Sequence, residues 1–389
     1  MPVSCAPIKD LLCALAALLL LAGSPAAAAP ELPPELEGVP VLMLTDLSSG
    51  RVLMARQADL SYAPASVTKV MTAYVAFEEM SEGRLSPLRR FEVRPETSKQ
   101  WYGEGTSMYL LPEDRPTAHE LLRGIMTASA NDASVVFAEG YAGSLDGFLF
   151  LMNDAARRLG MSNSRYNTPN GWPDQMQTYV SARDLTRLAH SMIERFPRLY
   201  RRYSGRLTFD WKDRTLYSHD PITGKVLGAD GIKTGYTRAA GYNFLGSAER
   251  NGRRLVMVVG GARSARERNA AALALIEWGF SEWRTRRLFD AGQVIGMADV
   301  QDGTARTVPL ATAAPVRATL ADGGNEAVSL EVRYDGPLKA PIRQGERVAE
   351  LTVHAGDAPS VSLPLYAARD IGKAGVMDRI VNAFMRLVA

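Results

Sequence analysis

The stretch of sequence that decides the fold reads Pro-Ala-Ser-Val-Thr-Lys-Val-Met-Thr and spans residues 64 to 72. Apolar residues recur after it at helical spacing, which predicts a largely buried helix from Ser66 to Glu79. Ser66 and Lys69 are three residues apart at the start of this helix, so the hydroxyl and the amine lie within mutual reach. Serine needs a base to attack a carbonyl, and burial together with a second cation lowers the pKa of a lysine toward the range where it can be that base.

Two further short motifs follow in order along the chain. In the first, Ser-Ala-Asn, Ser129 and Asn131 lie between two helical patterns, where a hydroxyl can relay a proton and an amide can hold a substrate carbonyl. In the second, Lys-Thr-Gly, Lys233 supplies positive charge, Thr234 supplies a hydroxyl, and Gly235 lets a substrate backbone lie close. This second motif is expected to precede a strand. Each motif alone is frequent by chance, but the three in this order are specific.

The pattern outward from these motifs predicts an α+β fold. Residues 41–55 alternate apolar and polar around a Ser-Ser-Gly turn, which indicates a hairpin. Helices are expected at 118–128, 130–139, 145–159, 182–194 and 266–278, and strands at 241–248 and 254–261. Strands are expected at both ends of this domain, with helices between them. This pattern predicts one antiparallel sheet that is completed by strands from the two ends of the domain and is flanked by the helices.

Composition divides the chain into four segments. Residues 1–29 are typical of a secretion signal, because an apolar run of about twelve residues, too short to span a bilayer, precedes a small-residue run. Residues 30–288 form the catalytic domain and 289–367, where alternating runs replace the helical period, a small all-β domain. Residues 368–389 end in an amphipathic helix, which we expect to bind the membrane surface rather than to pack on the protein.

Composition also excludes several functions. Both cysteines lie in the signal segment, so the mature chain has no thiol nucleophile and no disulfide. The four histidines are far apart and the glycines form no phosphate loop, so we expect no metal and no cofactor. The formal net charge is +3 without a basic block, which argues against nucleic acid as a partner.

With their flanks, the three motifs resemble those of the low-molecular-mass penicillin-binding proteins, the serine-type D-Ala-D-Ala carboxypeptidases. The flanks that carry the resemblance are residues 64–72, 128–133, 230–237 and 240–243. The resemblance covers roughly residues 41 to 366 and implies a transpeptidase-like domain followed by a β domain. One departure is the Asn-Gly-Trp run at 170–172, where the family has Asn-Gly-Leu; we interpret it as structural.

The resemblance also implies a role for each site residue. Ser66 would be the nucleophile, Lys69 the general base, and the backbone N–H groups of Ser66 and Tyr236 the oxyanion hole. Ser129 would pass a proton to the departing D-Ala, and Asn131 would orient Lys69 and the substrate amide. Lys233 and Thr234 would meet the terminal carboxylate, with Arg214 and Arg268 as further candidates from the family's arginine positions. Gly235 would let the substrate backbone lie close.

The function predicted from the sequence is therefore removal of the terminal D-Ala from peptidoglycan stem peptides through an acyl-enzyme, with β-lactams as further ligands. We expect the protein in the periplasm, attached to the outer face of the inner membrane. Three alternatives stay open: a serine β-lactamase, a DD-endopeptidase acting on crosslinks, and a non-catalytic peptidoglycan-binding scaffold.

Overall fold

The computed structural model describes residues 30–323, 326–356 and 358–375. The expected signal at 1–29 and the helix expected over the last fourteen residues, 376–389, lie outside the described residues. Residues 368–375 are not helical. They run along the β domain, where Ile371 forms a bridge with Ile342 and Lys373 forms one with Gly303.

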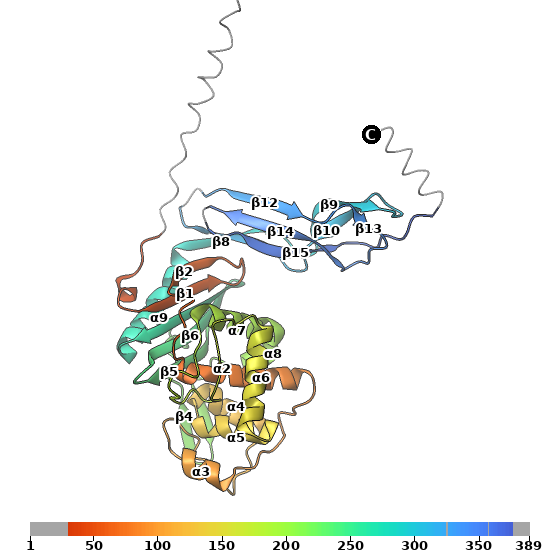
Figure 1. Ribbon diagram of the computed structural model, residues 1–389. Coiled ribbons are helices and arrows are strands. Elements are labelled where there is room, and N and C mark those ends of the chain that lie inside the picture. The colour runs from red at the N-terminus through yellow and green to blue at the C-terminus, as the bar shows by residue number, and fades with distance from the viewer. Residues whose placement is uncertain (1–29, 324–325, 357, 376–389) are drawn as a thin grey trace, which may run out of the picture.

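A five-stranded antiparallel sheet forms the middle of the catalytic domain, with the order β2-β1-β7-β6-β5. Its strands are β1 (Val41–Asp46), β2 (Val52–Arg56), β5 (Ala229–Thr237), β6 (Gly241–Arg250) and β7 (Arg253–Ala262). The first hairpin and the last three strands are far apart in sequence but share this sheet (Figure 1). The α+β prediction is confirmed.

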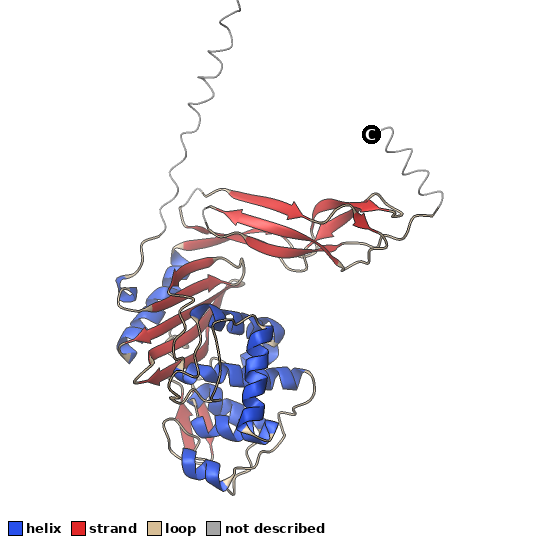
Figure 2. Ribbon diagram, viewed as in Figure 1, coloured by secondary structure: helices blue, strands red, loops and turns tan. Residues whose placement is uncertain are grey.

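Alternation along β1 explains why the sheet is covered on both faces. Val41 and Met43 pack into the core formed with the central helices, whereas Leu42 and Leu44 pack into a second core with α9 (Ala265–Ser281). Successive side chains of a strand point to opposite faces, so the apolar run at 41–44 requires cover on both sides. Figure 2 shows the helices in these two positions.

Helix α2 (Lys69–Ser81) runs through the larger core and follows directly on a 3₁₀ turn, η2 (Ala65–Thr68). The helix predicted from Ser66 is thus confirmed, with a tighter first turn. The helices around α2 are α3 (Pro95–Trp101), α4 (Ala118–Arg123), the π-helical turn η3 (Gly124–Ala128), α5 (Asn131–Ala142), α6 (Leu145–Arg158), α7 (Ala182–Arg195) and α8 (Pro197–Tyr203). The sequence did not predict α3, α8 or the hairpin of β3 (Thr208–Trp211) and β4 (Arg214–Tyr217). All four elements have seven or fewer residues, too few to establish a period.

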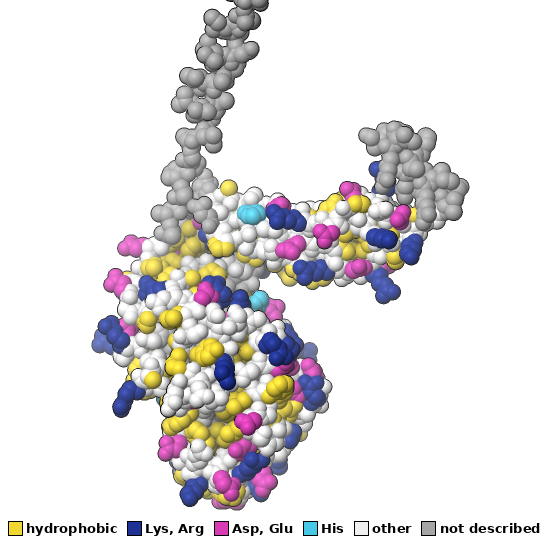
Figure 3. All heavy atoms as spheres, in the orientation of Figure 1, with side chains coloured by type: hydrophobic (Ala, Val, Ile, Leu, Met, Phe, Trp, Pro, Cys, Tyr) yellow, Lys and Arg dark blue, Asp and Glu magenta, His cyan; other side chains and the backbone are white. Residues whose placement is uncertain are grey.

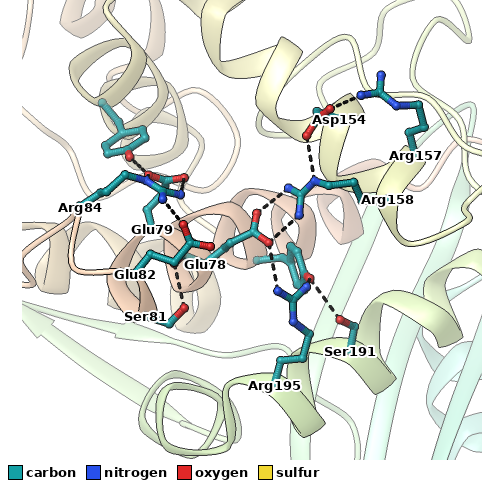
Figure 4. A network of polar contacts seen from close by, with 12 residues as sticks. Glu78, Glu79, Ser81, Glu82, Arg84, Asp154, Arg157, Arg158, Ser191 and Arg195 are labelled. Atoms are coloured by element: carbon teal, nitrogen blue, oxygen red, sulfur yellow. Dashed lines mark hydrogen bonds and ion pairs between the residues drawn. The ribbon is translucent and has the colours of Figure 1, made fainter. Parts of the chain in front are cut away.

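Ion pairs fix the end of α2 that is remote from Ser66 (Figure 4). Buried Glu78 accepts two hydrogen bonds from Arg158 of α6, at 2.7 and 2.6 Å, and lies 3.4 Å from Arg195 of α7. Arg158 lowers the pKa of Glu78 by this hydrogen bonding. Buried Glu79 also forms an ion pair, with Arg84 at 2.7 Å. The helix that carries the site is therefore held at its far end by its neighbours.

The β domain has a six-stranded sheet in the order β12-β14-β15-β10-β9-β13 and a separate β8–β11 pair. Its strands are β8 (Trp283–Phe289), β9 (Val294–Gln301), β10 (Thr307–Ala311), β11 (Val316–Ala321), β12 (Val328–Arg333), β13 (Leu338–Lys339), β14 (Arg347–Ala355) and β15 (Val361–Ala367). The sequence placed the change of composition near residue 288, but strand β8 already begins before that residue. The three arginines of β8 obscure the alternation of apolar and polar residues that would have indicated a strand. Buried Asp46 joins the domains by accepting hydrogen bonds of 2.8 Å from Thr285 and Thr319.

Two properties concern the molecule as a whole. On the face drawn in Figure 3, basic and acidic side chains are interspersed rather than gathered into one field. Within residues 30–323, 326–356 and 358–375, no single helix is long and apolar enough to cross a bilayer. The pair α5 and α6 passes that test together but is bent by 92°.

Candidate active site

The structure brings Ser66 and Lys69 into direct contact. Lys69 is fully buried at the first position of α2, and its Nζ donates a hydrogen bond of 2.8 Å to Ser66 Oγ. The same amine donates to Asn131 Oδ1 at 2.8 Å and to the backbone oxygen of Asn170 at 2.7 Å. Three oxygen atoms therefore surround one amine that is itself buried from water.

Burial lowers the pKa of Lys69 well below its ordinary value of 10.5, and the charge of Lys233 lowers it further. Nearby Asp132 opposes this shift. The desolvation of a charged amine and the repulsion between two cations both favour the neutral form. The sequence predicted that burial beside another cation would favour a neutral lysine, and the structure places Lys69 in such an environment.

Ser129 and Asn131 lie at the junction of η3 and α5, as the sequence predicts. Ser129 has a φ of 63°, a left-handed conformation that is uncommon for a residue other than glycine. Its backbone oxygen accepts a hydrogen bond of 2.6 Å from Thr106. Asn131 is fixed at both ends of its amide, because Nδ2 donates to Glu104 O at 2.9 Å while Oδ1 accepts from Lys69. The strained backbone and the fixed amide define one wall of the site.

The Lys-Thr-Gly motif lies within strand β5, not before a strand as the sequence predicted. Glycines interrupted the two-residue alternation by which a strand is predicted. Gly231, with a φ of +115°, lies at an irregularity in the pairing of β5 with β6. Gly235 packs against the turn of Ser66, where an added Cβ would lie 2.5 Å from Pro64 O and 3.0 Å from Ser66 N. The glycine is required because no other residue permits this approach.

The three motifs line one cavity of about 360 Å³. Its lining residues are Ser66, Gly105, Thr106, Ser129, Asn131, Gly171, Trp172, His219, Thr234, Gly235, Tyr236, Thr237, Tyr242, Ala265 and Arg268. Lys69 and Lys233 are buried next to this lining. Burial lowers the pKa of Lys233 to about 7, helped by the charge of Arg268 and opposed by Asp220.

The two arginines suggested by the resemblance lie in different places. Arg268, at the start of α9, is buried and lines the cavity. Arg214 is exposed on the β3–β4 hairpin, outside the cavity lining, and its guanidinium lies 4.4 Å from the centre of the Tyr109 ring. The β3–β4 hairpin thus holds Arg214 outside the cavity lining.

The sequence profile of the D-alanyl-D-alanine carboxypeptidases of peptidase family S11 matches residues 32–264. The chain belongs to this family. A second profile, that of the penicillin-binding protein 5 C-terminal domain, matches residues 283–373, which include the β domain.

Individual S11 relatives agree with this assignment over most of their length. The D-alanyl-D-alanine carboxypeptidase DacD of Escherichia coli strain K12 is 30% identical over 361 residues, or 90% of this chain and 91% of the relative. The crystal structure of penicillin-binding protein 5 from Haemophilus influenzae matches with a TM-score of 0.77 at 27% identity, covering 88% of this chain and 99% of that one. Penicillin-binding protein D2 of Listeria monocytogenes, solved in an ampicillin-bound form, matches with a TM-score of 0.57 at 27% identity, covering 65% of this chain and 100% of that one.

The run at 170–172, which the sequence suggested was structural, belongs to the site of this S11 peptidase. The backbone oxygen of Asn170 accepts from Lys69, and Trp172 lines the cavity. Gly171 has a φ of +74°, and an added Cβ would lie 1.9 Å from Ala65 O. The structural interpretation fits the close packing of Gly171, and folding also brings the run to Lys69 across a separation of 101 residues.

Sequence reasoning missed further residues around the site. The Gly-Glu-Gly run at 103–105 lies in a turn after α3, and Gly105 lines the cavity. Buried Asp132 accepts hydrogen bonds from Met108 N at 2.9 Å and Leu110 N at 3.0 Å, and so fixes the loop behind Asn131. His219 lines the cavity near Lys233 and Arg268. Of these residues, Asp132 alone had a signal, since it directly follows the Ser-Ala-Asn motif.

Proposed function

We propose that this protein is a serine D-alanyl-D-alanine carboxypeptidase that removes the terminal D-Ala of peptidoglycan stem peptides through an acyl-enzyme on Ser66. The observation that carries the proposal is the set of three hydrogen-bond partners around Lys69 Nζ. A neutral amine has two N–H donors and one lone pair. The oxygens of Asn131 and Asn170 can only accept, so the neutral amine donates to both and accepts from the hydroxyl of Ser66. Deprotonation of Lys69 thus turns the serine into the donor.

The reaction then proceeds by acyl transfer. Ser66 Oγ attacks the carbonyl carbon of the penultimate D-Ala while its proton passes to Lys69, and the oxyanion lies on the N–H groups of Ser66 and Tyr236. Ser129 passes its proton to the amine of the departing D-Ala as the C–N bond breaks and takes in return the proton that Lys69 received, which leaves Lys69 neutral again. Water then attacks the ester while Lys69 takes its proton, and Lys69 returns that proton to Ser66 Oγ as the ester C–O bond breaks.

The cationic part of the cavity supports a carboxypeptidase over an endopeptidase. Thr234 and Arg268 line the cavity, and Lys233 is buried beside them. Cations next to a hydroxyl suit a free terminal carboxylate, which a crosslinked D-Ala lacks. Release of D-Ala from a linear pentapeptide measures the carboxypeptidase, and cleavage of a crosslinked dimer into its two monomers measures the endopeptidase.

The residues that line the cavity also bear on whether a β-lactam acyl-enzyme is hydrolysed. Class A β-lactamases hydrolyse their acyl-enzyme with the help of a loop glutamate. Among the described residues that line this cavity, none carries a carboxylate. We therefore expect penicillin to acylate Ser66 and the adduct to persist, whereas sustained turnover of nitrocefin would favour the β-lactamase alternative.

The experiment that tests the proposed function is D-Ala release from a pentapeptide mimic by wild type, Ser66→Ala and Ser61→Ala. Ser61 is an exposed serine outside the cavity lining and serves as the matched control. Release by wild type and Ser61→Ala but not by Ser66→Ala is the expected result. Equal release by all three would exclude Ser66 as nucleophile, and no release by any would favour a scaffold.

We also propose that residues 1–29 direct export and that the chain acts in the periplasm, held on the inner membrane by residues 376–389. The support is the sequence pattern of both segments, which lie outside the described residues. Fractionation of cells that produce the full chain, or a chain that ends at residue 375, tests this. The full chain is expected in the membrane fraction and the shortened one in the periplasmic fluid. Recovery of both in the same fraction would contradict membrane attachment.

A further inference from the structure

A second cavity, of about 390 Å³, lies where the two domains meet. We call it the junction cavity. Its lining residues are Arg250, Asn251, Arg253, Phe280, Thr285, Arg287 and Arg317. They come from the turn between β6 and β7, from the end of α9, and from the β8–β11 pair that follows it (Figure 1). None of them lines the cavity of Ser66. More than half of the described lining residues are arginines and none is acidic, so this cavity attracts anions.

The four arginines form two cross-strand pairs of like charge. Arg250 lies opposite Arg253 at the end of the β6–β7 hairpin. Arg287 lies opposite Arg317 in the β8–β11 pair. Side chains of like charge that lie directly opposite one another destabilise an antiparallel pair. Arg317 also links the two pairs, because its Nη1 donates a hydrogen bond of 2.5 Å to the backbone oxygen of Gly252 in the hairpin turn. Two unfavourable pairs that meet at one cavity indicate a ligand of opposite charge.

Carboxylates of the protein neutralise these arginines only in part. Arg250 forms an ion pair with Glu277 at 2.6 Å, and Arg287 forms one with Asp290 at 2.7 Å. Both side chains of the second pair are more than half exposed, and such surface pairs are weak. Arg317 is partly buried and has no ion pair within the part of the chain that the structure describes. At least one positive charge at the junction cavity therefore lacks a counterion.

Arg253 is the most buried of the four arginines, and one of its donors has no acceptor. The residue is 9% exposed. Its Nε donates to Asp46 at 2.7 Å and its Nη1 to the backbone oxygen of Trp283 at 2.7 Å. Both acceptors belong to residues outside the cavity lining. Nη2 is buried and has no hydrogen-bond partner among the described residues, which is unfavourable. Nη2 is thus the donor of Arg253 that remains for a ligand.

We propose that the junction cavity binds a phosphate group. A planar carboxylate is satisfied by one guanidinium in a bidentate pair. A phosphate has more acceptor oxygens, arranged as a tetrahedron, and carries up to two negative charges, which suits guanidinium groups that come from two separate strand pairs. The ring of Phe280 helps to orient two of these groups, since its centre lies 4.2 Å from the guanidinium carbon of Arg250 and 5.5 Å from that of Arg253. A phospholipid headgroup and a soluble phosphate ester share this chemistry.

The test is equilibrium dialysis of the full chain against radiolabelled inorganic phosphate at constant ionic strength. Wild type is expected to bind phosphate saturably, with a Kd of about 1 mM or tighter. Arg317→Gln removes the arginine without a counterion and weakens binding about tenfold or more. The matched control is Arg286→Gln, which leaves the Kd unchanged, because Arg286 is exposed on the same strand as Arg287 but lies outside the cavity lining. If Arg317→Gln does not fold, as thermal unfolding would show, Arg287→Gln replaces it with the same expected loss.

Three outcomes overturn the proposal. Wild type that is folded but binds no phosphate saturably has no such site. An equal loss of affinity in Arg286→Gln shows that net charge alone attracts the anion. Acetate that competes with phosphate at equal concentration shows that the cavity does not select a phosphate over a carboxylate. Each result is independent of the reaction at Ser66, because the two cavities share no lining residue.

Competition then distinguishes the sources of the phosphate group. Displacement of labelled phosphate from wild type by phosphatidylglycerol vesicles identifies a lipid headgroup as the ligand. Displacement by glycerol phosphate but not by the vesicles identifies a soluble phosphate ester. Both results support the site. In either case the displacement must follow the phosphate affinity in Arg317→Gln and Arg286→Gln, and displacement that is the same in the two variants contradicts binding at the junction cavity.

Discussion

Lys69 and Lys233 are both buried, and the charge of Lys233 lowers the pKa of Lys69. The two amines have opposite requirements. Lys69 acts as a base only when it is neutral, whereas Lys233 attracts a carboxylate only when it is charged. The site is therefore able to catalyse the reaction in the pH range where Lys69 has lost its proton and Lys233 has kept its proton.

The first prediction concerns pH. Lys233 has a pKa of about 7, so it loses its charge as the pH rises through 7 and kcat/KM for D-Ala release falls above that pH. Arg268 is one cause of this low pKa. In Arg268→Ala the pKa of Lys233 rises and the falling limb moves to higher pH. Profiles of kcat/KM from pH 5 to 10 measure this. Exposed Arg266→Ala is the control, and a limb that stays in place in Arg268→Ala contradicts the account.

A second prediction separates the two family arginines. Arg268→Ala removes a cation that lines the cavity and lowers kcat/KM at pH 6 by about 10- to 100-fold, the loss that follows removal of a charged hydrogen-bond partner. Arg214→Ala removes a guanidinium that stacks on Tyr109 and changes kcat/KM less than twofold. Steady-state kinetics with one peptide measure both. Equal losses in the two variants would show that Arg214 reaches the substrate in solution.

The third prediction tests the base. Lys69→Arg keeps positive charge at the position, but a guanidinium does not give up its proton at neutral pH. Loss of general-base catalysis lowers the rate of acylation by penicillin by about 10²- to 10⁴-fold. Stopped-flow labelling with a fluorescent penicillin measures the rate, and exposed Lys99→Arg is the control. A rate within threefold of wild type would exclude Lys69 as the base.

A fourth prediction concerns stability. Asp132 accepts four hydrogen bonds, of 2.7 Å from Ser107 Oγ, 2.9 Å from Met108 N, 3.0 Å from Leu110 N and 2.8 Å from Ala133 N. Asp132→Ala leaves these buried donors without an acceptor and lowers the free energy of unfolding by about 3 kcal/mol. Urea denaturation measures the loss. Asp146→Ala, an exposed change in the first turn of α6, should cost less than 1 kcal/mol, and similar losses would contradict this role for Asp132.

Sequence predicted the parts of the molecule that local patterns encode. The hairpin of β1 and β2, the helix after Ser66 and the junction at Ser129 all follow from periodicity within a short window. Strand β5 did not, because glycines at 231 and 235 are placed for backbone contacts and interrupt the alternation.

The rest of the site depends on long-range contacts. Asn170 reaches Lys69 and Trp172 reaches the cavity only after the chain has folded, and nothing in the sequence around them indicates this. Arg214 shows the opposite case, in which a residue at a plausible position in the sequence lies on a hairpin outside the cavity lining. The motifs thus identify the chemistry, and the fold decides which neighbours take part in it.

The most direct measurement of the central claim is the intact mass of the protein after incubation with benzylpenicillin, followed by peptide mapping. Wild type is expected to gain the mass of one penicilloyl group on the peptide that contains Ser66, and Ser66→Ala to gain none. An adduct on another residue, or a wild type that stays unmodified at millimolar penicillin, would contradict the claim that Lys69 activates Ser66.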